Sequence, residues 1–513
     1  MPKSAKALCG KITVMEFLDP EYKRRHNIIL VLGQGLVGIA VVTAALLLVL
    51  KAYGFDLDRK TGEVIQSGLV YVDSAPDKAN IRINGNIHSD KTNTRFTLPS
   101  GSYNLQLEKE NYRTWQRQFD LEGSAVERFT YPMLIPKDLK PAVVDSSTTM
   151  NFLFSQSPDR KWLVVSENSE LTSLKDYNLT DLTENKLPKS RSFALPAGIF
   201  EKATSTNQFE VIEWSNNNAN FLVKHTFDGK IEYALLNRDE PAKSFNLKTV
   251  GTIDGEVSLL DKSADKLLVF NKTSGVLNLI NVKDKKTTQL LTGVLSFKSH
   301  GDDKILFTRV SPSDKTKARV ALLDNNKSYD VREIPISSNL PVDIATFHSK
   351  WYLIIGSEKE SKTYIYEDFV DKFKNDPLKT VSPIRVTKNN ITTPLKISFS
   401  KNTRFISSFS GSEISIYDIE DKRSYRYDLK VQLPEAESPV WMDGHRVILS
   451  GTGQAVVLDF DGSNKQTLTP IPSNKNIFFD RDYERYYTVT SNQLEPTKID
   501  LKSIPLRAGD DLR

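Results

Sequence analysis

The chain has almost no cysteine, since Cys9 is the single one among its 513 residues. One cysteine cannot form a disulfide within the chain, so its folded parts must be stabilised by apolar cores and strand ladders. Cys9 resembles a lipidation site only superficially, because no apolar stretch precedes it. We interpret it as a reduced thiol in a cytoplasmic tail.

The chain also lacks a strong net charge. Its formal charge is +5, and six basic against three acidic residues in the segment 1–27 account for more than half of that surplus. The rest of the chain is close to neutral. Proteins that bind nucleic acid usually carry a heavier basic patch. We therefore expect no nucleic-acid partner.

No short motif of enzyme chemistry occurs in the sequence. The nucleophile elbow G-x-S-x-G, the zinc motif H-E-x-x-H and the phosphate-binding loop are all absent. His300 and His445 lie in expected turns before apolar strands, and we interpret both as solvated. We predict no catalytic, cofactor-binding or metal-binding residue. The six histidines are isolated along the chain: His26, His88, His225, His300, His348 and His445.

Two aspartate pairs resemble parts of a ligand loop. Asp459 and Asp461 have the spacing of calcium ligands, but the other oxygen ligands of such a loop are missing. A tight Asp-Gly turn explains this pair, and the same interpretation holds for Asp480 and Asp482. Carboxylates that are distant in sequence can still meet in the folded chain, so a non-local acid pair stays open.

One long hydrophobic run is present, from Ile28 to Leu50, and it contains no charged residue. As a helix it would extend about 35 Å, which is enough to cross a hydrocarbon core of roughly 30 Å. This run predicts a transmembrane helix at 28–50 that places the chain in a lipid bilayer. Ala40 and Ala44 form a small-xxx-small pair, which gives a weaker hypothesis of dimerisation through this helix.

The same run contains an alternative. Gly33, Gly35 and Gly38 spell the dinucleotide-binding pattern G-x-G-x-x-G, with Asp56 and Asp58 about 20 residues later. In a soluble fold the helix after these glycines would have a charged face, and none is present. We favour the membrane interpretation, because glycine is common in membrane helices.

The flanks of the run predict its orientation. Lys23, Arg24 and Arg25 lie at its N-terminal edge, whereas the positive charges beyond Leu50 are diluted by Asp56 and Asp58. The positive-inside rule then places the tail 1–27 in the cytoplasm and the remainder outside the cell membrane. A cleaved signal peptide is the alternative, but the run is longer than usual and no clear cleavage site precedes Lys51.

A compact β module is expected after a linker at 51–68. Asn84-Gly85 predicts a tight turn, and Tyr103, Leu105 and Leu107 alternate with polar residues as in a strand. The segments Val72–Gly85 and Leu98–Tyr112 resemble the two halves of a PEGA domain over about 69–136. Lys78 and Asn111 stand where that family commonly has glycine. The resemblance implies a β-sandwich-like module of bacterial envelope proteins, with no catalytic residue.

From Val144 onward one composite pattern recurs every 40 to 60 residues: an apolar or aromatic strand, a polar turn and a strongly apolar strand. Such a period with about four strands per unit predicts a β-propeller over 144–506, similar to TolB- and WD40-like propellers, followed by a tail at 507–513. Eight blades are favoured, seven stay open, and an array of β-sandwiches is the alternative. Copies begin near Phe154, Trp214, Leu260, Phe297, Phe347, Phe399, Trp441 and Phe479.

Two functions follow from this mainly β organisation. In the first, a membrane-anchored envelope protein uses its exported propeller and PEGA-like module to bind a protein, peptide or glycan partner without catalysis. In the second, an exported hydrolase or lyase has its active site in the propeller funnel, which requires Asp, Glu, His or Tyr side chains to converge near the axis.

Overall fold

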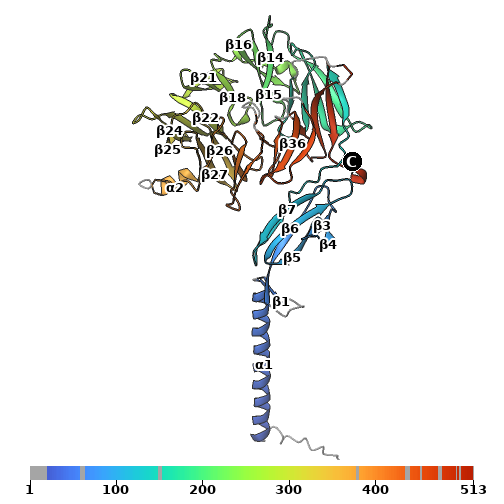
Figure 1. Cartoon of the computed structure of the whole chain (residues 1–513). Helices are drawn as coiled ribbons and strands as arrows, with labels where there is room; N and C mark the ends of the chain where they lie inside the picture. The colour runs from blue at the N-terminus through green and yellow to red at the C-terminus, as the bar shows by residue number, and fades with distance from the viewer. Residues whose placement is uncertain are drawn as a thin grey trace, which may run out of the picture. The chain divides into compact units, whose positions relative to one another are not determined.

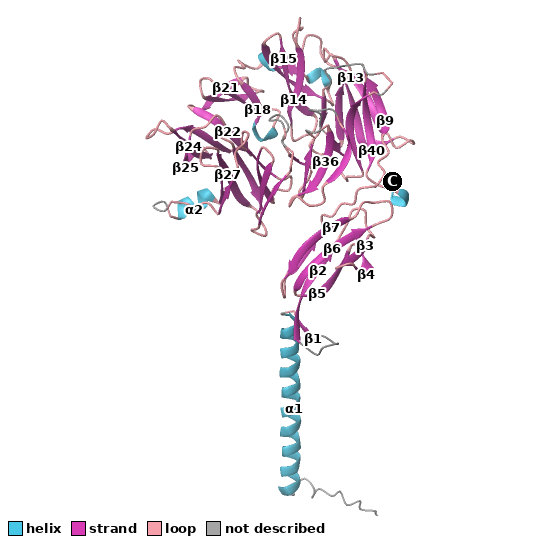
Figure 2. Ribbon diagram, in the orientation of Figure 1, coloured by secondary structure: helices cyan, strands magenta, loops and turns pink. Residues whose placement is uncertain are grey.

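The computed structural model of the chain is mainly β, with one long helix (Figures 1 and 2). Its contacts divide the chain into two compact units, 1–109 with 114–134 and 110–113 with 135–513, which we describe one at a time. The residues described are 20–52, 54–57, 64–147, 153–376, 380–431, 433, 439–450, 453–471, 477–492, 494–495 and 498–511. The first part of the predicted tail, including Cys9, lies outside them.

The long helix is α1 (Pro20–Ala52), which includes the whole run from Ile28 to Leu50. Its most apolar stretch has a mean hydropathy of 2.3 and is entirely unburied, and its leucines, isoleucines and valines are exposed. Such a surface is unfavourable in water by about 25 cal/mol for each Å² of apolar area. Within the described part of the chain, α1 is the one helix long and apolar enough to cross a membrane.

The glycines of the run lie inside α1. Gly33, Gly35 and Gly38 are all helical, and open space surrounds the position of a Cβ at each of them. A dinucleotide site needs a strand and a tight turn at these glycines. The uninterrupted helix therefore shows that the dinucleotide alternative is wrong.

The β part of the first unit consists of two four-stranded sheets. Its buried side chains, among them Val70, Val72, Ile81, Leu105 and Trp115, form the core between them. The expected linker 51–68 contains β1 and the start of β2. These two strands pair antiparallel, from Phe55 opposite Gln66 to Leu57 opposite Val64. One sheet consists of β1 (Phe55–Leu57), β2 (Val64–Val72), β5 (Thr94–Pro99) and β8 (Val126–Phe129). The other sheet consists of β4 (Asn86–Lys91), β3 (Asn80–Ile83), β6 (Gly101–Glu108) and β7 (Trp115–Leu121).

Turn geometry explains several residues of the PEGA-like pattern. Asn84 and Gly85 have φ values of 50° and 82° and connect β3 to β4, which confirms the predicted tight turn. Lys78 and Asn111, which stand where the family commonly has glycine, have φ values of 58° and 63°. Both therefore adopt the left-handed conformation that glycine reaches without steric cost.

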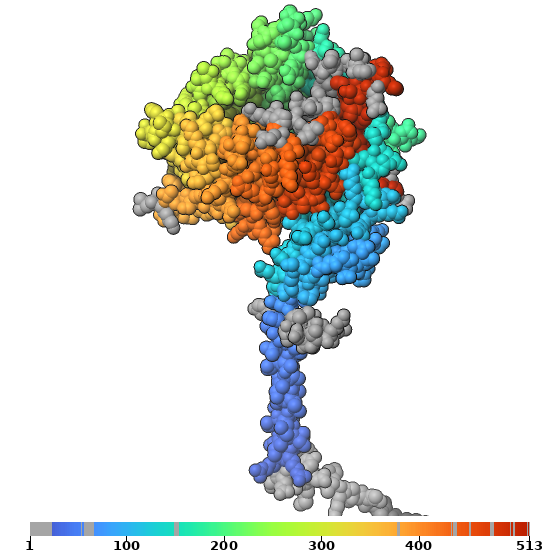
Figure 3. All heavy atoms as spheres, in the orientation of Figure 1, coloured from blue at the N-terminus to red at the C-terminus, as the bar shows by residue number. Residues whose placement is uncertain are grey.

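The second unit contains eight four-stranded sheets among its described residues, which we number blades 1 to 8. Figure 3 shows the later blades side by side in chain order, from yellow through orange to red. Blade 1 contains β10 (Phe154–Gln156), β11 (Trp162–Ser166), β12 (Ser173–Leu182) and β13 (Pro188–Ala194), and blade 2 contains β14 (Asn207–Trp214), β15 (Asn220–Phe227), β16 (Lys230–Asn237) and β17 (Phe245–Asn246). Blade 3 contains β18 (Glu256–Leu259), β19 (Lys266–Asn271), β20 (Val276–Asn281) and β21 (Lys286–Leu291), and blade 4 contains β22 (Val294–His300), β23 (Lys304–Val310), β24 (Lys317–Asp324) and β25 (Lys327–Pro335).

The last blade joins the two ends of this unit. Strand β9 (Ala142–Ser147) pairs antiparallel with β40, so the start of the unit supplies the fourth strand of blade 8. Eight blades, the favoured number, are present, and the alternative of seven is wrong. Blade 5 contains β26 (Val342–Phe347), β27 (Lys350–Ser357), β28 (Lys362–Glu367) and β29 (Arg385–Lys388), and blade 6 contains β30 (Lys396–Phe399), β31 (Phe405–Ser410), β32 (Glu413–Asp418) and β33 (Ser424–Asp428). Blade 7 contains β34 (Val440–Trp441), β35 (Arg446–Leu449), β36 (Gln454–Asp459) and β37 (Gln466–Pro470), and blade 8 contains β38 (Phe478–Phe479), β39 (Arg485–Ser491), β40 (Ile499–Pro505) and β9.

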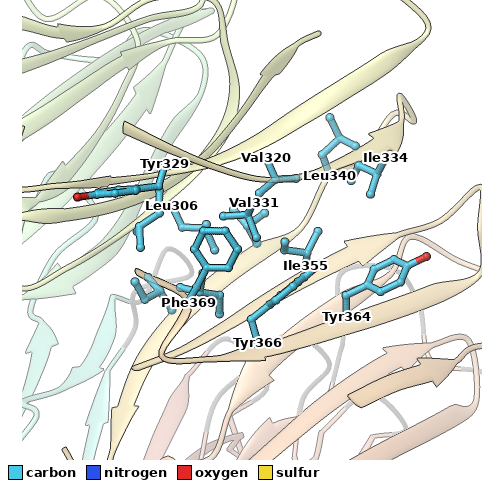
Figure 4. Packing of buried hydrophobic residues seen from close by; sticks show 14 of the residues in the cluster. Leu306, Val320, Tyr329, Val331, Ile334, Leu340, Ile355, Tyr364, Tyr366 and Phe369 are labelled. Carbon is cyan, nitrogen blue, oxygen red and sulfur yellow. The ribbon is translucent and has the colours of Figure 1, made fainter. Parts of the chain in front are cut away.

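Apolar clusters join neighbouring blades into a ring. Figure 4 shows Leu306 and Val320 of blade 4 against Ile355 and Tyr366 of blade 5, with Phe369 of the short helix α2 (Phe369–Asn375) beside them. Each of these side chains is at least 95% buried. Other clusters join blades 1 and 2, 2 and 3, 3 and 4, 5 and 6, and 8 and 1.

The recurring polar turn has a common hydrogen-bond pattern. In blade 1, Ser157 Oγ donates to Asp159 Oδ1 (2.5 Å) and accepts from Trp162 N (3.1 Å). In blade 6, Ser400 Oγ likewise donates to Asn402 Oδ1 (2.7 Å) and accepts from Phe405 N (3.0 Å). This local closure links the first strand of a blade to its second.

Candidate binding site in the propeller channel

The first strand of each blade forms the inner edge of its sheet. Gln156 Nε2 of blade 1 donates to the carbonyl of Phe479 in blade 8 (2.8 Å), and strands β22, β26 and β30 contact one another in order. The aromatic residues at the ends of these strands strengthen the ring, as Trp214 Nε1 donates to Ser155 Oγ of the preceding blade (2.9 Å). Side chains of the first strands therefore line the channel of the propeller.

Two carboxyl groups and one lysine form the charged cluster of blades 2 to 5. Glu213 is the penultimate residue of β14 and accepts a hydrogen bond from Leu259 N of blade 3. Burial raises the pKa of Glu213, against the opposing charges of Lys298 and Lys262. Burial also raises the pKa of Asp343 in β26, although Lys298 and backbone N–H groups oppose the shift. The charge of Lys298 thus acts on both carboxyl groups.

More acidic groups lie on the same side of the ring. Glu210 of β14 and Glu256 of β18 are exposed, and both act on the hydroxyl of Tyr233, whose pKa is raised by burial and by these two charges. Together with Glu213 and Asp343 they outnumber the lysines of the cluster. These four carboxyl groups all lie on first strands, in blades 2, 3 and 5.

The other half of the ring carries a second cluster in the turns between first and second strands. Arg160 of blade 1 stacks on Tyr483 of blade 8, with its guanidinium carbon 4.4 Å from the ring centre. Desolvation of the ammonium group and the charge of Arg160 lower the pKa of Lys401 to about 8, opposed by Asp443. Burial would raise the pKa of Asp443, but Arg446 and backbone N–H groups lower it overall. This cluster combines the cations Arg160, Lys401 and Arg446 with Asp443 and the ring of Tyr483.

The structure corrects the interpretation of two histidines. The ring centres of His300 and Trp351 are 5.2 Å apart, and those of His445 and Phe405 are 5.5 Å apart. Both pairs pack edge to face. Burial lowers the pKa of His300 and lowers that of His445 to about 4. The prediction that both are solvated turn histidines is wrong, because aromatic side chains of neighbouring strands cover them.

The aspartate turns have the predicted form. Asp461 Oδ1 accepts from Ser463 N (3.1 Å) and Ser463 Oγ (2.7 Å), and Gly462 N donates to the carbonyl of Asp459 (2.9 Å). Asp480 Oδ1 accepts from Glu484 N (2.8 Å), as in a closed turn. Among the described residues, no group of three or more histidine, cysteine, aspartate or glutamate side chains is arranged to hold a metal ion.

Comparison with known families agrees with the two-sheet module of the first unit. The model of the PEGA domain matches residues 67–133. This segment is a PEGA domain. Its match begins within β2 and ends after β8, so it includes the turn of Asn84-Gly85 and the buried Trp115. No curated protein matches the chain.

Solved structures similar to the chain include several proteins of low identity. The Dos1 propeller has a TM-score of 0.42, with 12% identity over 71% of this chain and 95% of that one. The dihydro-heme d1 dehydrogenase NirN in complex with DHE has a TM-score of 0.38, with 13% identity over 63% of this chain and 66% of that one. An oligogalacturonate lyase in complex with manganese has a TM-score of 0.37, with 10% identity over 72% of this chain and 98% of that one.

The sequence did not single out the channel residues. Glu213, Lys298 and Asp343 come from three blades, and only closure of the ring brings them near one another. One signal was present. Each of them lies in the apolar first strand of a repeat, as Glu213 does directly before the aromatic Trp214.

Proposed function

We propose that this chain is a single-pass membrane protein of the cell envelope, with its N-terminus in the cytoplasm and its PEGA domain and propeller outside, and that the propeller channel binds a partner. The observation that supports binding is the acidic half of the channel, where Glu210, Glu213, Glu256 and Asp343 lie on blades 2, 3 and 5. The partner best suited to this surface is a protein or peptide segment that carries lysine or arginine. A glycan would engage the same carboxylates through its hydroxyl groups.

The single cysteine makes the topology directly testable. Cys9 should react with a membrane-impermeant maleimide only after the cells are permeabilised, whereas Asp284→Cys in a Cys9→Ser background should react in intact cells. Labelling of Cys9 in intact cells would contradict the orientation. A mature protein that has lost Cys9 altogether would instead identify the helix as a cleaved signal sequence.

Crosslinking tests the partner. The intact protein is crosslinked in its native envelope, and the captured proteins and glycans are compared between the wild type and the double variant Glu210→Gln/Glu256→Gln. We expect the variant to lose one specific partner. Glu184→Gln/Asp284→Asn, on exposed outer turns, should retain it. Equal capture by all three proteins would refute binding through the acidic channel.

A second candidate function has a specific observation in its favour. The raised pKa values of Glu213 and Asp343, with Lys298 close to both, resemble the carboxyl pair of an exported hydrolase or lyase. Peptides and glycans are incubated with the purified full chain and with Glu213→Gln and Asp343→Asn. Turnover that both variants abolish would favour catalysis, and the absence of turnover in the wild type would favour binding alone.

A further inference from the structure

The turns between first and second strands contact one another from blade to blade. Tyr483 Oη, in the turn of blade 8, donates to the carbonyl of Met442 in the turn of blade 7 (3.3 Å), and Arg160 of blade 1 stacks on the ring of Tyr483. From the other side, Lys401 N of blade 6 donates to the carbonyl of Asp443 (3.4 Å). The turn of blade 7 is therefore contacted from both sides, and Arg160, Lys401 and Tyr483 are gathered around it.

Two cations of this group lack an acidic partner. Within the described part of the chain, neither Arg160 nor Lys401 forms an ion pair, whereas Arg446 pairs with Asp443, with 2.7 Å between Nη2 and Oδ2. The charge of Asp443 thus compensates that of Arg446. The group formed by these four side chains and Tyr483, which we call the turn cluster, has a surplus of two positive charges, those of Arg160 and Lys401.

The two unpaired cations act on each other. Desolvation of the ammonium group and, after it, the charge of Arg160 lower the pKa of Lys401 to about 8. Lys401 is still mostly protonated at neutral pH, so the two like charges repel each other in the free protein. An anion bound between them would replace this repulsion by attraction. Solvent reaches both side chains, since Lys401 is exposed and Arg160 is half-buried.

The chemistry of the two cations indicates which anion fits. The ring of Tyr483 covers one face of the Arg160 guanidinium and leaves its N–H edges for a ligand. These N–H groups match two oxygens of a carboxylate or a phosphate, and an ammonium adds a compact charge. A phosphate monoester carries nearly two negative charges at neutral pH, which equals the surplus of the turn cluster. A carboxylate carries only one.

We propose that the turn cluster of blades 1, 6, 7 and 8 binds a phosphate group between Arg160 and Lys401, with Tyr483 holding the guanidinium in place. Inorganic phosphate and a phosphate monoester both present this chemistry. The site uses none of the carboxyl groups of blades 2, 3 and 5, so it goes beyond the proposed function, and failure of either proposal leaves the other intact.

Calorimetric titration of the full chain in micelles of a phosphate-free detergent tests this site. Methyl phosphate, which is mostly a dianion at neutral pH, is compared with the monoanions dimethyl phosphate and acetate. We expect methyl phosphate to bind at least about tenfold tighter than either monoanion. Inorganic phosphate that binds as tightly as methyl phosphate would identify the free anion as the ligand, and tighter binding of glycerol phosphate would identify a phosphate carried on a larger molecule. The proposal is overturned if methyl phosphate does not bind, or if it binds no tighter than the monoanions.

Variants assign the binding to the named residues. Arg160→Asn/Lys401→Met should weaken the binding of methyl phosphate at least about tenfold. Asparagine suits the left-handed backbone of Arg160, whose φ is 59°, so the fold should tolerate this change. Lys283→Met/Lys285→Asn is the matched control, because it removes two exposed lysines from an outer turn of blade 3, where Lys285 has a φ of 51°. The control should bind as the wild type does, and unchanged binding by Arg160→Asn/Lys401→Met would refute the site.

A second measurement is local to Lys401. Its pKa of about 8 in the free protein should rise when phosphate binds, because a nearby anion stabilises the charged form. NMR of lysines that carry isotope-labelled methyl groups follows this rise, and the signal that Lys401→Arg lacks identifies the residue. A pKa of Lys401 that methyl phosphate leaves unchanged would contradict the proposal.

Discussion

At the scale of single residues, a left-handed backbone occurs in the PEGA domain at Lys78, where the family commonly has glycine. Lys78 has a φ of 58° and its side chain is exposed. The left-handed conformation is unfavourable for residues with a Cβ by about 1–2 kcal/mol. Glycine avoids this steric cost, but it loses more chain entropy on folding, which offsets part of the gain.

We therefore expect Lys78→Gly to stabilise the PEGA domain by about 1 kcal/mol, which corresponds to a rise in Tm of roughly 4–8 °C for a domain of this size. Differential scanning calorimetry of the full chain would measure it. Asp77→Gly is the matched control, since Asp77 is exposed and has no positive φ. That change should leave Tm unchanged or lower it, and a fall with Lys78→Gly would contradict the strain argument.

A buried carboxyl group in blade 2, Glu232, makes stability depend on pH. Glu232 accepts hydrogen bonds from the ring of His225 (2.9 Å) and from Glu201 N (2.8 Å), and both side chains of the pair are almost fully buried. Burial alone would raise the pKa of Glu232, but these bonds, with Asn246 and Lys248, lower it from 4.5 to about 2. The stabilisation is therefore complete above pH 4.5 and is lost as the pH falls towards 2.

Relative to Glu232→Gln, the wild type should be more stable by roughly 3 kcal/mol at pH 7, and this difference should vanish near pH 2. Thermal unfolding across pH 2–7 would measure the difference. Glu184→Gln, an exposed change on an outer turn, should show no such dependence. A difference that is independent of pH would mean that Glu232 stabilises the blade by packing alone.

At the scale of elements, the apolar strands were predictable and the polar ones were not. Alternation and the polar turn locate strands such as Trp162–Ser166, because their inward side chains must be apolar. Outer strands such as β21 (Lys286–Leu291) are exposed and rich in lysine, threonine and glutamine, so hydrophobicity gives no signal there. The channel cluster was missed for a different reason: Glu213 and Asp343 become neighbours of Lys298 only when whole blades pack.

The interface between blades 4 and 5 offers a test of that packing. Leu306 is fully buried in this cluster, so Leu306→Ala removes apolar contacts and leaves a void. We expect a loss of about 2–5 kcal/mol in the free energy of unfolding, measured as a lower unfolding temperature of the propeller. Leu494→Ala, at a side chain that is 92% exposed, should have no measurable effect. An equal effect of both changes would contradict the assignment of this core.

At the scale of the whole propeller, stability depends on one pairing between distant strands. Ser146 Oγ donates to Asp500 Oδ1 (2.7 Å) across 354 residues of sequence. A disulfide at the next pair of this ladder, Ser147→Cys/Ile499→Cys in a Cys9→Ser background, would close a loop of about that length. Paired strands place Cα atoms within the range that a disulfide spans.

The loop-closure model predicts a gain of about 6 kcal/mol for so long a loop, and engineered disulfides often give less. The measurement is the difference in Tm between the oxidised and reduced protein. Thr226→Cys/Ile231→Cys, across the hairpin of β15 and β16, closes only a few residues and should give a much smaller difference. Equal gains from both disulfides would show that closure of the ring does not limit stability.

The pairing of β9 with β40 in blade 8 also sets the order of events during folding. Because β9 precedes the other described strands of the propeller, it is synthesised first and has to wait until β40, the last of them, has followed. Until then the nascent propeller has two open strand edges, each able to pair with another chain. Folding of the propeller should therefore require that aggregation is slow or that chaperones cover those edges, and the hazard ends only when β40 has paired with β9.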